Sequence, residues 1–422
     1  MLTWHIILIK WNRIETNENL YRFVLICYFV PRWEKRLNMK VLLVSSSFFP
    51  KIDGSTRCVY DHGRKLAEVG SIVYLVTRGV DEAKKYEVVD GIRVVRSNTS
   101  FRLGSTLSKL RLALEQMITI IRLHRAIHFD VIHVHGFTAC ISALPCKYIF
   151  GIPVFITTHG TELLWPKEVW WKSPSEVKLG VLFERFVLSR CDAIIVQSPG
   201  VRRYMLQIYG RGIGKKMVQV HTGIDHAKFK AGTRETSTPQ VLFVGALSEI
   251  KGVSDLITSF AEARRSVPAA KLLLVGSGTA VQKYKELVNK LDLDGAVEFL
   301  GAIRDDVKLK ELYRQSEVVV LPSNVGGPIS VTILEGLSSG RAVISTNVPG
   351  GIPDVLGGGV GILVERGDRK KLAEELEKLM LKDDYRAGFE HRAREAVEEL
   401  YTLDAMVDKL TLLYRKVAKL AQ

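Results

Sequence analysis

The sequence has few cysteines and lacks a long apolar run. Its five cysteines are odd in number and form no Cys-x-x-Cys pair. This argues against a disulfide framework or a zinc site and favours a reducing, cytoplasmic compartment. The longest clean apolar run, Phe23–Val30, is too short to span a bilayer. The sequence therefore predicts neither a disulfide-rich secreted protein nor an integral membrane protein.

Acidic residues are scarce in only one half of the chain. Residues 1–230 hold 34 lysines and arginines against 18 acidic residues, whereas residues 231–422 hold 26 against 27. The net charge of +15 thus comes from the first half. It points to a polyanionic partner, such as acidic lipid headgroups, a lipid-phosphate acceptor or nucleic acid. Solubility alone is the alternative. Nucleic acid ranks last, because the sequence has no recognised nucleic-acid motif.

The first 38 residues differ from the rest. Met39 opens a segment that reads as a first β-strand, and the preceding residues lack the basic, apolar and small-residue order of a signal peptide. We interpret residues 1–38 as an extension upstream of a translation start at Met39. The alternative is a membrane-surface anchor built on Phe23–Val30 and its flanking basic residues.

From Met39 onward, apolar strands alternate with amphipathic helices, which predicts an α/β protein with parallel sheets covered on both faces. The polar segment His226–Pro239 interrupts the alternation and reads as a linker. We predict two doubly wound, Rossmann-like domains, residues 39–228 and 229–400, that face a cleft at the carboxyl ends of their strands. Residues 401–422 have a helical apolar period.

The most informative segment is Val318–Gly340. An apolar run ends in Pro322-Ser323, a glycine-rich turn follows, and a helix opens near Ser330. Free N–H groups and the positive end of a helix dipole then meet at one point, which suits a phosphate. Glu335 lies one to two turns into this helix, close enough to accept a hydrogen bond from a sugar hydroxyl of the same ligand.

This segment resembles the nucleotide-sugar site of glycosyl transferases group 1, the retaining glycosyltransferases with the GT-B fold, of the glycosyltransferase family 4 type. The resemblance covers about residues 39–420. It implies that the last helix returns to the first domain, that the first domain binds the acceptor, and that the second domain binds a nucleotide-diphospho-sugar. The donor-binding residues that it implies are Gly54, Ser55, Gly245, Lys251, Gly327, Pro328, Ile329, Ser330, Val331, Thr332 and Glu335.

Two positions of the second domain depart from the family pattern. The segment Val241–Val253 resembles a strand followed by Gly-Arg-Leu-x-x-x-Lys-Gly, in which Lys251 would neutralise the leaving diphosphate, but Ala246 replaces the arginine. A charged hydrogen bond in a dry site contributes several kcal/mol to catalysis, so another cation must replace it or the enzyme is slow. The family also has two glutamates, of which the second is Glu335, the ribose contact. The first, the sugar contact, falls on Gly327.

The loop after the first strand is also altered, because Gly54 matches the family's first glycine but Ser55 replaces the second. Serine can still present its backbone N–H in this loop. Because Gly327 lacks the carboxylate, backbone groups of residues 328–332 would hold the sugar hydroxyls and phosphate instead.

Histidines follow two strands of the first domain. Phe155–Thr161 resembles the family's Thr-x-His segment, which implies that His159 lies beside the donor sugar and the acceptor; a histidine satisfied by neighbouring carbonyls is the alternative. His133 and His135 alternate on a strand, so we expect structural roles on opposite sides, which argues against a shared metal ion. We expect no metal and no cofactor, since Lys251 and helix dipoles would carry the leaving-group charge.

The helix expected over Ser105–His128 has apolar residues on one face and several basic residues. We expect its apolar face to pack on the core. The alternative is docking on an anionic membrane, as a basic helix of the acceptor domain does in membrane-associated members of the family, which would hold the protein peripherally at the inner membrane face. The residues of that apolar face are Leu107, Leu110, Leu114, Met117 and Ile121.

These observations lead to one hypothesis: a retaining glycosyltransferase that moves a sugar from a nucleotide-diphospho-sugar to a lipid-linked or glycan acceptor. Its catalytic residues would be His159, Lys251 and Glu335. Two alternatives stay open: a nucleotide-sugar epimerase of the same fold, and a catalytically weak relative that only binds nucleotide-sugars.

Overall fold

The computed structural model describes residues 5–9, 24–28, 38–50, 54–80, 83–98, 106–159, 173–230, 232, 234–303 and 305–421. Near the N-terminus, β1 (His5–Ile9) pairs antiparallel with β2 (Val24–Tyr28). Strand β2 lies within the apolar run Phe23–Val30. The rest of the proposed extension, except Asn38, lies outside the described residues, as do the side chains of Leu107 and Lys109.

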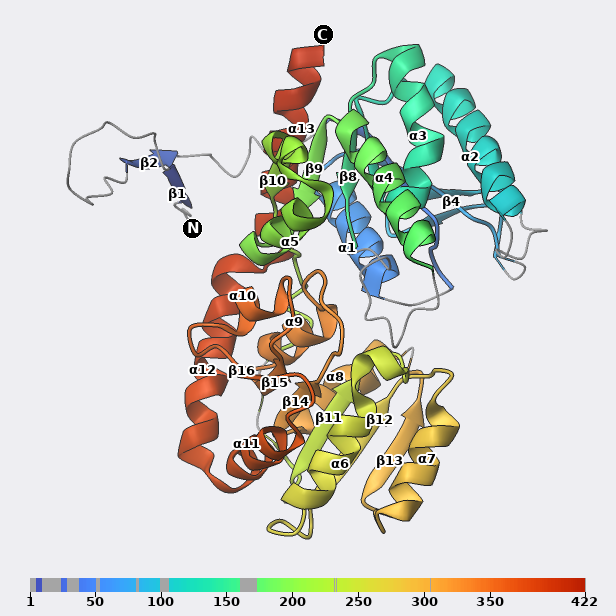
Figure 1. Ribbon diagram of the computed structural model, residues 1–422. Coiled ribbons are helices and arrows are strands. Elements are labelled where there is room, and N and C mark those ends of the chain that lie inside the picture. The colour runs from blue at the N-terminus through green and yellow to red at the C-terminus, as the bar shows by residue number, and fades with distance from the viewer. Residues whose placement is uncertain are drawn as a thin grey trace.

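The first domain is built on an eight-stranded sheet with the order β10-β9-β8-β7-β3-β4-β6-β5 (Figure 1). All neighbours are parallel except β5 and β6. The strands are β3 (Lys40–Ser45), β4 (Ile72–Thr77), β5 (Tyr86–Val89), β6 (Ile92–Arg96), β7 (Val131–His135), β8 (Val154–Thr157), β9 (Ala193–Val196) and β10 (Met217–Gln219).

The helices of this domain cover both faces of its sheet. They are α1 (Gly54–Glu68), α2 (Thr106–Ile127), α3 (Phe137–Phe150), α4 (Pro174–Arg190) and α5 (Pro199–Tyr209), followed by the 3-10 turn η3 (Arg211–Lys216). The side chains of β3 show the two faces. Leu42 and Val44 belong to one apolar cluster, with α2 to α5, and Val41 and Leu43 belong to another, with α1. Alternate residues of a strand point to opposite faces, so both faces are buried.

The second domain has a six-stranded parallel sheet with the order β13-β12-β11-β14-β15-β16. Its strands are β11 (Gln240–Val244), β12 (Lys271–Val275), β13 (Val297–Gly301), β14 (Val318–Leu321), β15 (Ala342–Thr346) and β16 (Ile362–Val364). Its helices are η4 (Glu249–Lys251), α6 (Val253–Ala263), α7 (Val281–Lys290), α8 (Asp306–Gln315), α9 (Val331–Ser338), α10 (Ile352–Leu356), α11 (Arg369–Leu381) and α12 (Asp383–Leu400). The predicted α/β fold with two doubly wound, Rossmann-like domains is confirmed.

The chain passes between the domains twice, at neighbouring points. Ile224 on the first passage accepts a hydrogen bond from Leu403 N, and Ile224 N donates to Tyr401 O at 2.7 Å. After the second passage, α13 (Leu403–Ala421) runs back along the first domain (Figure 1). Its Met406, Leu410 and Tyr414 are buried in the same apolar cluster as α1.

One expectation about α2 is met only in part. Leu110 and Leu114 were expected to face the core but are 54% and 48% exposed, whereas Leu112, Ala113 and Ile120 are buried. Met117 and Ile121 of the expected apolar face are half-buried and pack against the core cluster. None of the helices in the described ranges has the length and apolar character needed to span a bilayer.

Candidate active site

The carboxyl ends of the two sheets meet at the domain boundary. In each sheet the strand order reverses at its first strand, β3 or β11, and ligands of doubly wound sheets bind at such points. The domains touch here: Gly200 N of α5 donates to Asp354 Oδ2 of α10 at 2.5 Å. An apolar pocket between them is lined by Phe137, Thr158 and Tyr204 from the first domain and by Gly327 from the second, among others.

Backbone hydrogen bonds to the loop after β15 fix the glycine-rich loop after β14. Gly327 N donates to Pro349 O at 3.0 Å, and Gly351 N donates to Gly327 O at 2.8 Å. The loop leads into α9, whose N-cap residue Ser330 forms no side-chain capping hydrogen bond. The N–H groups of the first helical turn are therefore available to an anion, and the helix dipole favours negative charge there.

Thr332 lies in this first turn, but its hydroxyl is already used in a hydrogen bond within the domain. Its Oγ1 donates to Val244 O, the last residue of β11, at 3.0 Å. The hydrogen bond ties α9 to the strand that leads to Lys251. Of the predicted donor residues in this loop, Pro328, Ser330, Val331 and Thr332 are half-buried and Ile329 is buried. Their backbone groups, rather than the Thr332 hydroxyl, are placed to meet a ligand.

Lys251 ends the 3-10 turn η4, and this turn packs against the loop after β14. Asn324 N donates to Ile250 O at 2.8 Å. Gly252 follows with φ of 67°, and a β-carbon there would lie 1.8 Å from Pro322 O. Only glycine permits both this left-handed conformation and this close approach. The Lys-Gly pair of the sequence motif thus brings the lysine to the same edge of the sheet as the N-terminus of α9.

The Lys251 ammonium has no counter-ion among the described residues. It forms no ion pair or hydrogen bond with any residue in those ranges. Burial lowers its pKa, since a charge is less well solvated inside the protein. A half-buried cation without an acidic partner is costly unless an anion meets it. Lys251 is therefore the side chain best suited to receive a negatively charged ligand.

Glu335 is buried in α9, 7% exposed, and Tyr313 of α8 donates a hydrogen bond to its Oε2 at 2.7 Å. Burial raises the pKa of Glu335 to about 7. The Tyr313 hydroxyl and the guanidinium of Arg57 act in the opposite direction. The carboxyl group therefore changes charge near neutral pH, and one of its oxygens is already engaged by the protein.

Gly54 and Ser55 begin α1, on the opposite side of the boundary. Gly54 is exposed, and a β-carbon there would meet no atom within 4 Å. The preceding residues of the loop, 51–53, lie outside the described residues. Gly245 follows β11 and donates its N–H to Val275 O at 2.9 Å, so this backbone donor is used within the sheet.

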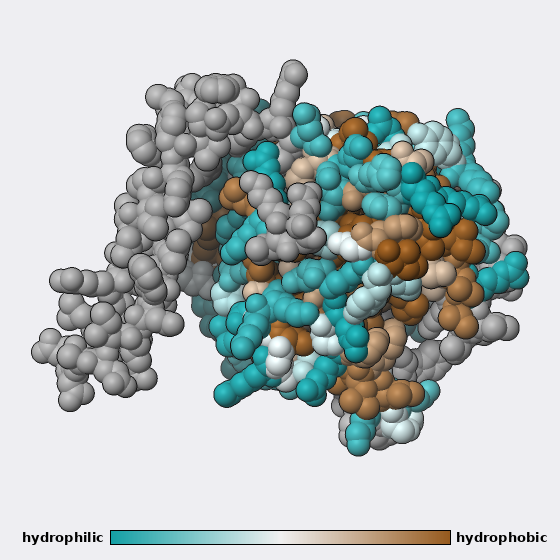
Figure 2. All heavy atoms as spheres, turned by 90° about the horizontal axis from the view of Figure 1, so that it is seen from above, coloured by the Kyte–Doolittle hydropathy of each residue, from teal (hydrophilic) through white to brown (hydrophobic). Residues whose placement is uncertain are grey.

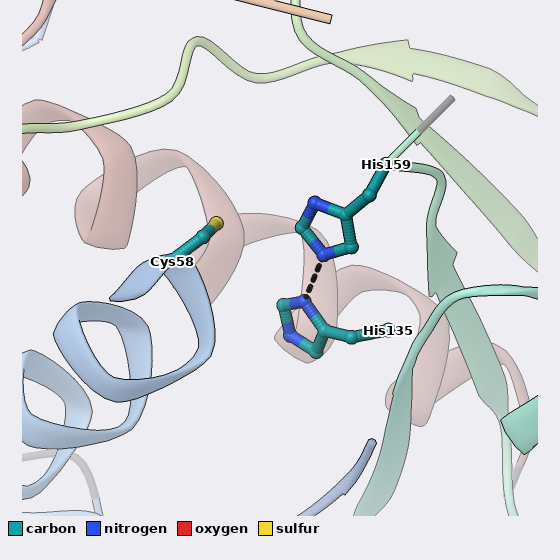
Figure 3. A group of neighbouring side chains, drawn as sticks. All are labelled: Cys58, His135 and His159. Carbon is teal, nitrogen blue, oxygen red and sulfur yellow. Dashed lines mark hydrogen bonds between the residues drawn. The ribbon is translucent and has the colours of Figure 1, made fainter. Parts of the chain in front are cut away.

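His159 follows β8 and belongs to a group of histidines (Figure 3). Nδ1 of His135 is hydrogen-bonded to Nε2 of His159 at 3.0 Å, and Nε2 of His135 to Nδ1 of His62 at 3.2 Å. Burial holds the pKa of His62 at about 3 and that of His135 well below its usual value. These two imidazoles are neutral at physiological pH.

The expectation that His133 and His135 face opposite sides is wrong. Their rings stack with centroids 4.7 Å apart. Side chains two positions apart on a strand point to the same face, so the alternation was assigned incorrectly. Both histidines therefore line the space beneath α1 and α13.

Two overlapping groups of described residues could hold a metal ion. Ligand atoms within 4.8 Å of one another come from Cys58, His135 and His159, and from His62, His133 and His135. Cys58 and His159 approach His135 from α1 and from the end of β8 (Figure 3). Burial raises the pKa of the Cys58 thiol to about 12, which opposes the thiolate that a metal needs. The expectation of no metal stays a prediction.

Two family models match the chain in succession. Glycosyltransferase Family 4 matches residues 52–228, and Glycosyl transferases group 1 matches residues 225–396. The chain is a group 1 glycosyltransferase. The two matched regions overlap at residues 225–228, directly after Ile224 on the first passage between the domains.

Alignments with known proteins of similar sequence or fold cover most of this glycosyltransferase. It is 26% identical over 381 residues to the glycogen synthase of Mycobacterium tuberculosis, covering 86% of this chain and 90% of that one. Sucrose-phosphate synthase from Thermosynechococcus elongatus has a TM-score of 0.78 at 22% identity, covering 90% and 99% of the two chains. Anabaena HepE in complex with UDP-glucose has a TM-score of 0.72 at 18% identity, covering 90% and 100%. The structural likenesses confirm the GT-B fold.

The two departures of the second domain from the family pattern lie at the domain boundary of this glycosyltransferase. Ala246, in place of the arginine, is exposed beside β11. At Gly327, in place of the first glutamate, a β-carbon would meet no atom within 4 Å. Crowding therefore does not explain the missing carboxylate.

Arg57 is a residue that the sequence analysis missed. In the first turn of α1, its guanidinium lies 3.2 Å from Asp61 of the same helix and 3.5 Å from Asp306 of α8, across the boundary. It also lowers the pKa of Glu335 electrostatically. The sequence offered one hint, its place just after Gly54 and Ser55, but its partner Asp306 is 249 residues away. Arg57 is therefore a cation at the domain boundary that acts on Glu335.

Proposed function

We propose that this glycosyltransferase moves a sugar, with retention of configuration, from a nucleotide-diphospho-sugar to a lipid-linked or glycan acceptor. The observation that carries the proposal is Lys251, a half-buried ammonium without an acidic partner in the described structure, held beside the open N-terminus of α9. Together they would bind the two phosphates of the donor and stabilise the charge that develops when the diphosphate leaves.

The nucleotide would be held by Glu335. Tyr313 engages Oε2 of this carboxylate, so a ribose hydroxyl would donate to the other oxygen. Anabaena HepE, of the same fold, has been crystallised with UDP and with UDP-glucose, which supports a nucleotide-sugar donor for this chain. The base and the sugar remain to be identified by binding.

Retention would need no side-chain nucleophile. The departing phosphate oxygen accepts the proton of the acceptor hydroxyl on the face of the sugar from which it leaves, while the hydroxyl oxygen bonds to the anomeric carbon. The atoms balance: the glycosidic bond forms, the sugar–phosphate bond breaks, and the proton ends on the diphosphate. His159 would orient the sugar or the acceptor, and domain closure would exclude water.

A thermal-shift screen of UDP-, GDP- and ADP-sugars tests the proposal. Donor at 100 times its Kd stabilises the folded protein by about 2.7 kcal/mol, enough to raise Tm by several degrees. We expect a rise with sugars of one base, and a smaller one with the matching nucleoside monophosphate, which lacks the second phosphate. No rise with any donor or nucleoside diphosphate would contradict the proposal. Product analysis without acceptor separates a transferase from an epimerase, because an epimerase needs none.

We further propose that the first domain docks on an anionic membrane. Four apolar side chains of α4 are 42% to 69% exposed: Leu179, Leu182, Phe183 and Phe186. Basic residues of the same helix, Lys178, Arg185 and Arg190, lie among them. Figure 2, which looks onto this domain, shows brown apolar groups among hydrophilic ones. Apolar burial and attraction to acidic headgroups act together in such helices.

Sedimentation with vesicles tests this docking. We expect binding to vesicles that contain phosphatidylglycerol, weakening with salt, and little binding to pure phosphatidylcholine. The double variant Leu182→Glu with Phe186→Glu should lose at least about tenfold in vesicle affinity. Val307→Glu, at a 73% exposed position of the second domain, is the matched control and should bind normally. Equal binding of both variants would refute docking through α4.

A further inference from the structure

A continuous chain of hydrogen bonds leads from the C-terminal helix to His159. Thr157 Oγ1 lies 2.7 Å from His133 Nε2, and His133 Nδ1 contacts the Tyr414 hydroxyl. The same hydroxyl lies 3.1 Å from His62 Nε2. His62 then contacts His135, and His135 contacts His159, as described above. Thr157, His133, Tyr414, His62 and His135 are at most 6% exposed.

The protons in this chain can run in only two ways. A neutral imidazole has one N–H group and one lone pair, and a hydroxyl has one hydrogen. Each contact needs a single proton, so every inner imidazole must donate on one side and accept on the other. The Tyr414 hydroxyl has two lone pairs and could accept from both His133 and His62, but its own buried hydrogen would then have no acceptor among the described residues. Tyr414 therefore also donates on one side and accepts on the other. The whole chain therefore donates either toward His159 or away from it. In the first case the outer nitrogen of His159, Nδ1, carries a proton; in the second it carries a lone pair.

The buried end of the chain decides between the two directions. If His133 donated to Thr157, the Thr157 hydroxyl hydrogen would need another acceptor, and the described residues provide none. An unsatisfied buried hydroxyl is costly. If Thr157 donates to His133 instead, every contact is satisfied. Burial also keeps His62, His133 and His135 neutral, with lowered pKa values, so no imidazolium interrupts the sequence.

We propose that Tyr414, His62 and His135 are positioning residues that fix His159 as a neutral hydrogen-bond donor through Nδ1. His159 would thus donate to an oxygen of the sugar, the phosphate or the acceptor, and would not act as the base that removes the acceptor proton. This role rests on the proposed function, but the tautomer itself does not. The terminal helix α13 becomes part of the site, although Tyr414 touches no substrate.

The chain of hydrogen bonds also affects whether the histidines can bind a metal ion. Each lone pair along it accepts a hydrogen bond, so a metal ion at His135 and His159 would have to displace a proton from the chain. We expect no change in the histidine resonances on addition of stoichiometric Zn²⁺. Zinc-dependent shifts of His135 and His159 would overturn the closed chain and favour the metal site instead.

Nitrogen NMR of the full chain with ¹⁵N-labelled histidine tests the tautomer. The His159 signals are assigned by their loss in His159→Gln. We expect a protonated Nδ1 and an accepting Nε2. A protonated Nε2 in the wild type would overturn the proposal, whether or not a sugar donor has been found. Absence of turnover with a correct tautomer would instead count against the proposed function.

Tyr414→Phe removes the central hydroxyl and keeps the ring that packs on Phe155 at 4.9 Å. We expect mixed His159 tautomers, and a kcat lowered on the order of tenfold, because the oriented N–H group of His159 is then missing from part of the molecules. The KM for the nucleotide-sugar should stay unchanged. Tyr284→Phe is the matched control. Tyr284 is also fully buried, but its hydroxyl has no partner in the described structure, so its removal should change neither quantity. An unaltered tautomer and kcat in Tyr414→Phe would refute the positioning role.

Discussion

Replacing Lys251 with alanine is expected to lower kcat by about 10²- to 10³-fold while leaving the protein folded. The ammonium would be the main side-chain cation on the departing diphosphate, because Ala246 cannot supply the usual second charge. Loss of one preorganised charged donor in a dry site has an effect of this size. The measurement is the initial rate of sugar transfer with saturating donor, using the donor found by thermal shift.

Folding should survive this substitution, because Lys251 forms no ion pair with the described residues. Removing a charge whose pKa is lowered by burial relieves a desolvation cost, so Tm should stay within a few degrees of the wild type. Lys283→Ala is the control: this lysine is 59% exposed and pairs with Glu249 of the same turn as Lys251. Full turnover of the Lys251 variant would refute its role as the leaving-group cation.

Replacing Glu335 with glutamine is expected to weaken nucleotide-sugar binding about 5- to 10-fold and yet to stabilise the free protein at high pH. A hydrogen bond from a ribose hydroxyl to a carboxylate contributes about 1.5–3 kcal/mol, roughly twice as much as one to an amide. The affinity of both proteins is measured by calorimetry at pH 8, where the wild-type carboxyl group is ionised.

The stability change has a definite sign. In the unfolded chain Glu335 ionises above its ordinary pKa of 4.5, but in the folded protein it keeps its proton up to about pH 7. Its burial therefore costs stability increasingly between these values, reaching on the order of 3 kcal/mol above pH 7. Glutamine removes this penalty, so the gain in Tm should be largest above pH 7 and vanish below the ordinary pKa of a glutamate.

Glu317→Gln is the matched control for the affinity measurement. Glu317 is also a buried glutamate, 7% exposed, but it lies at the amino end of β14, away from the site, and accepts a hydrogen bond from Gln240 N. Burial raises the pKa of Glu317 as well, so its replacement should also raise Tm at high pH, but it should leave donor affinity unchanged. Wild-type affinity of Glu335→Gln at pH 8 would show that the carboxylate does not hold the ribose.

The same carboxyl group sets the pH dependence of donor binding. If only the ionised form accepts the ribose hydroxyls, affinity rises with pH up to about 7 and then levels off. Arg57 lowers the pKa of Glu335, so Arg57→Met should move this midpoint to higher pH. Arg203→Met, which removes another arginine paired across the boundary, 3.6 Å from Asp354, should leave the midpoint in place.

The strand–helix alternation predicted the two domains because the buried parallel strands are continuous apolar runs. The helix α3 was missed, since Phe137–Phe150 is apolar on nearly every side and contains Pro145, so it shows no amphipathic period. Strand β5 was missed because it is a short edge strand with exposed Tyr86 and Val88. Periodicity identifies elements with one buried face, and these two elements have none that is clear.

At the site, motif spacing led to Lys251 and Glu335 because both lie in the turn and helix segments that follow β11 and β14. It could not reveal what surrounds them. The Tyr313 hydrogen bond to Glu335, the ion pair of Arg57 with Asp306, and the contact of Tyr414 with the histidines all join residues distant in sequence. Such partners are set by how helices pack on the sheets, which local patterns do not encode.

The neighbouring passages at Ile224 and Thr402 give the molecule a pivot. Because both covalent connections between the halves cross at one place, opening and closing can occur as a rotation about it, with little stretching of the chain. A bulky residue at Gly223, where a β-carbon would lie 2.8 Å from Thr402 O, would stiffen or displace this axis. Such a change would alter how fast products escape without touching any group that binds the donor.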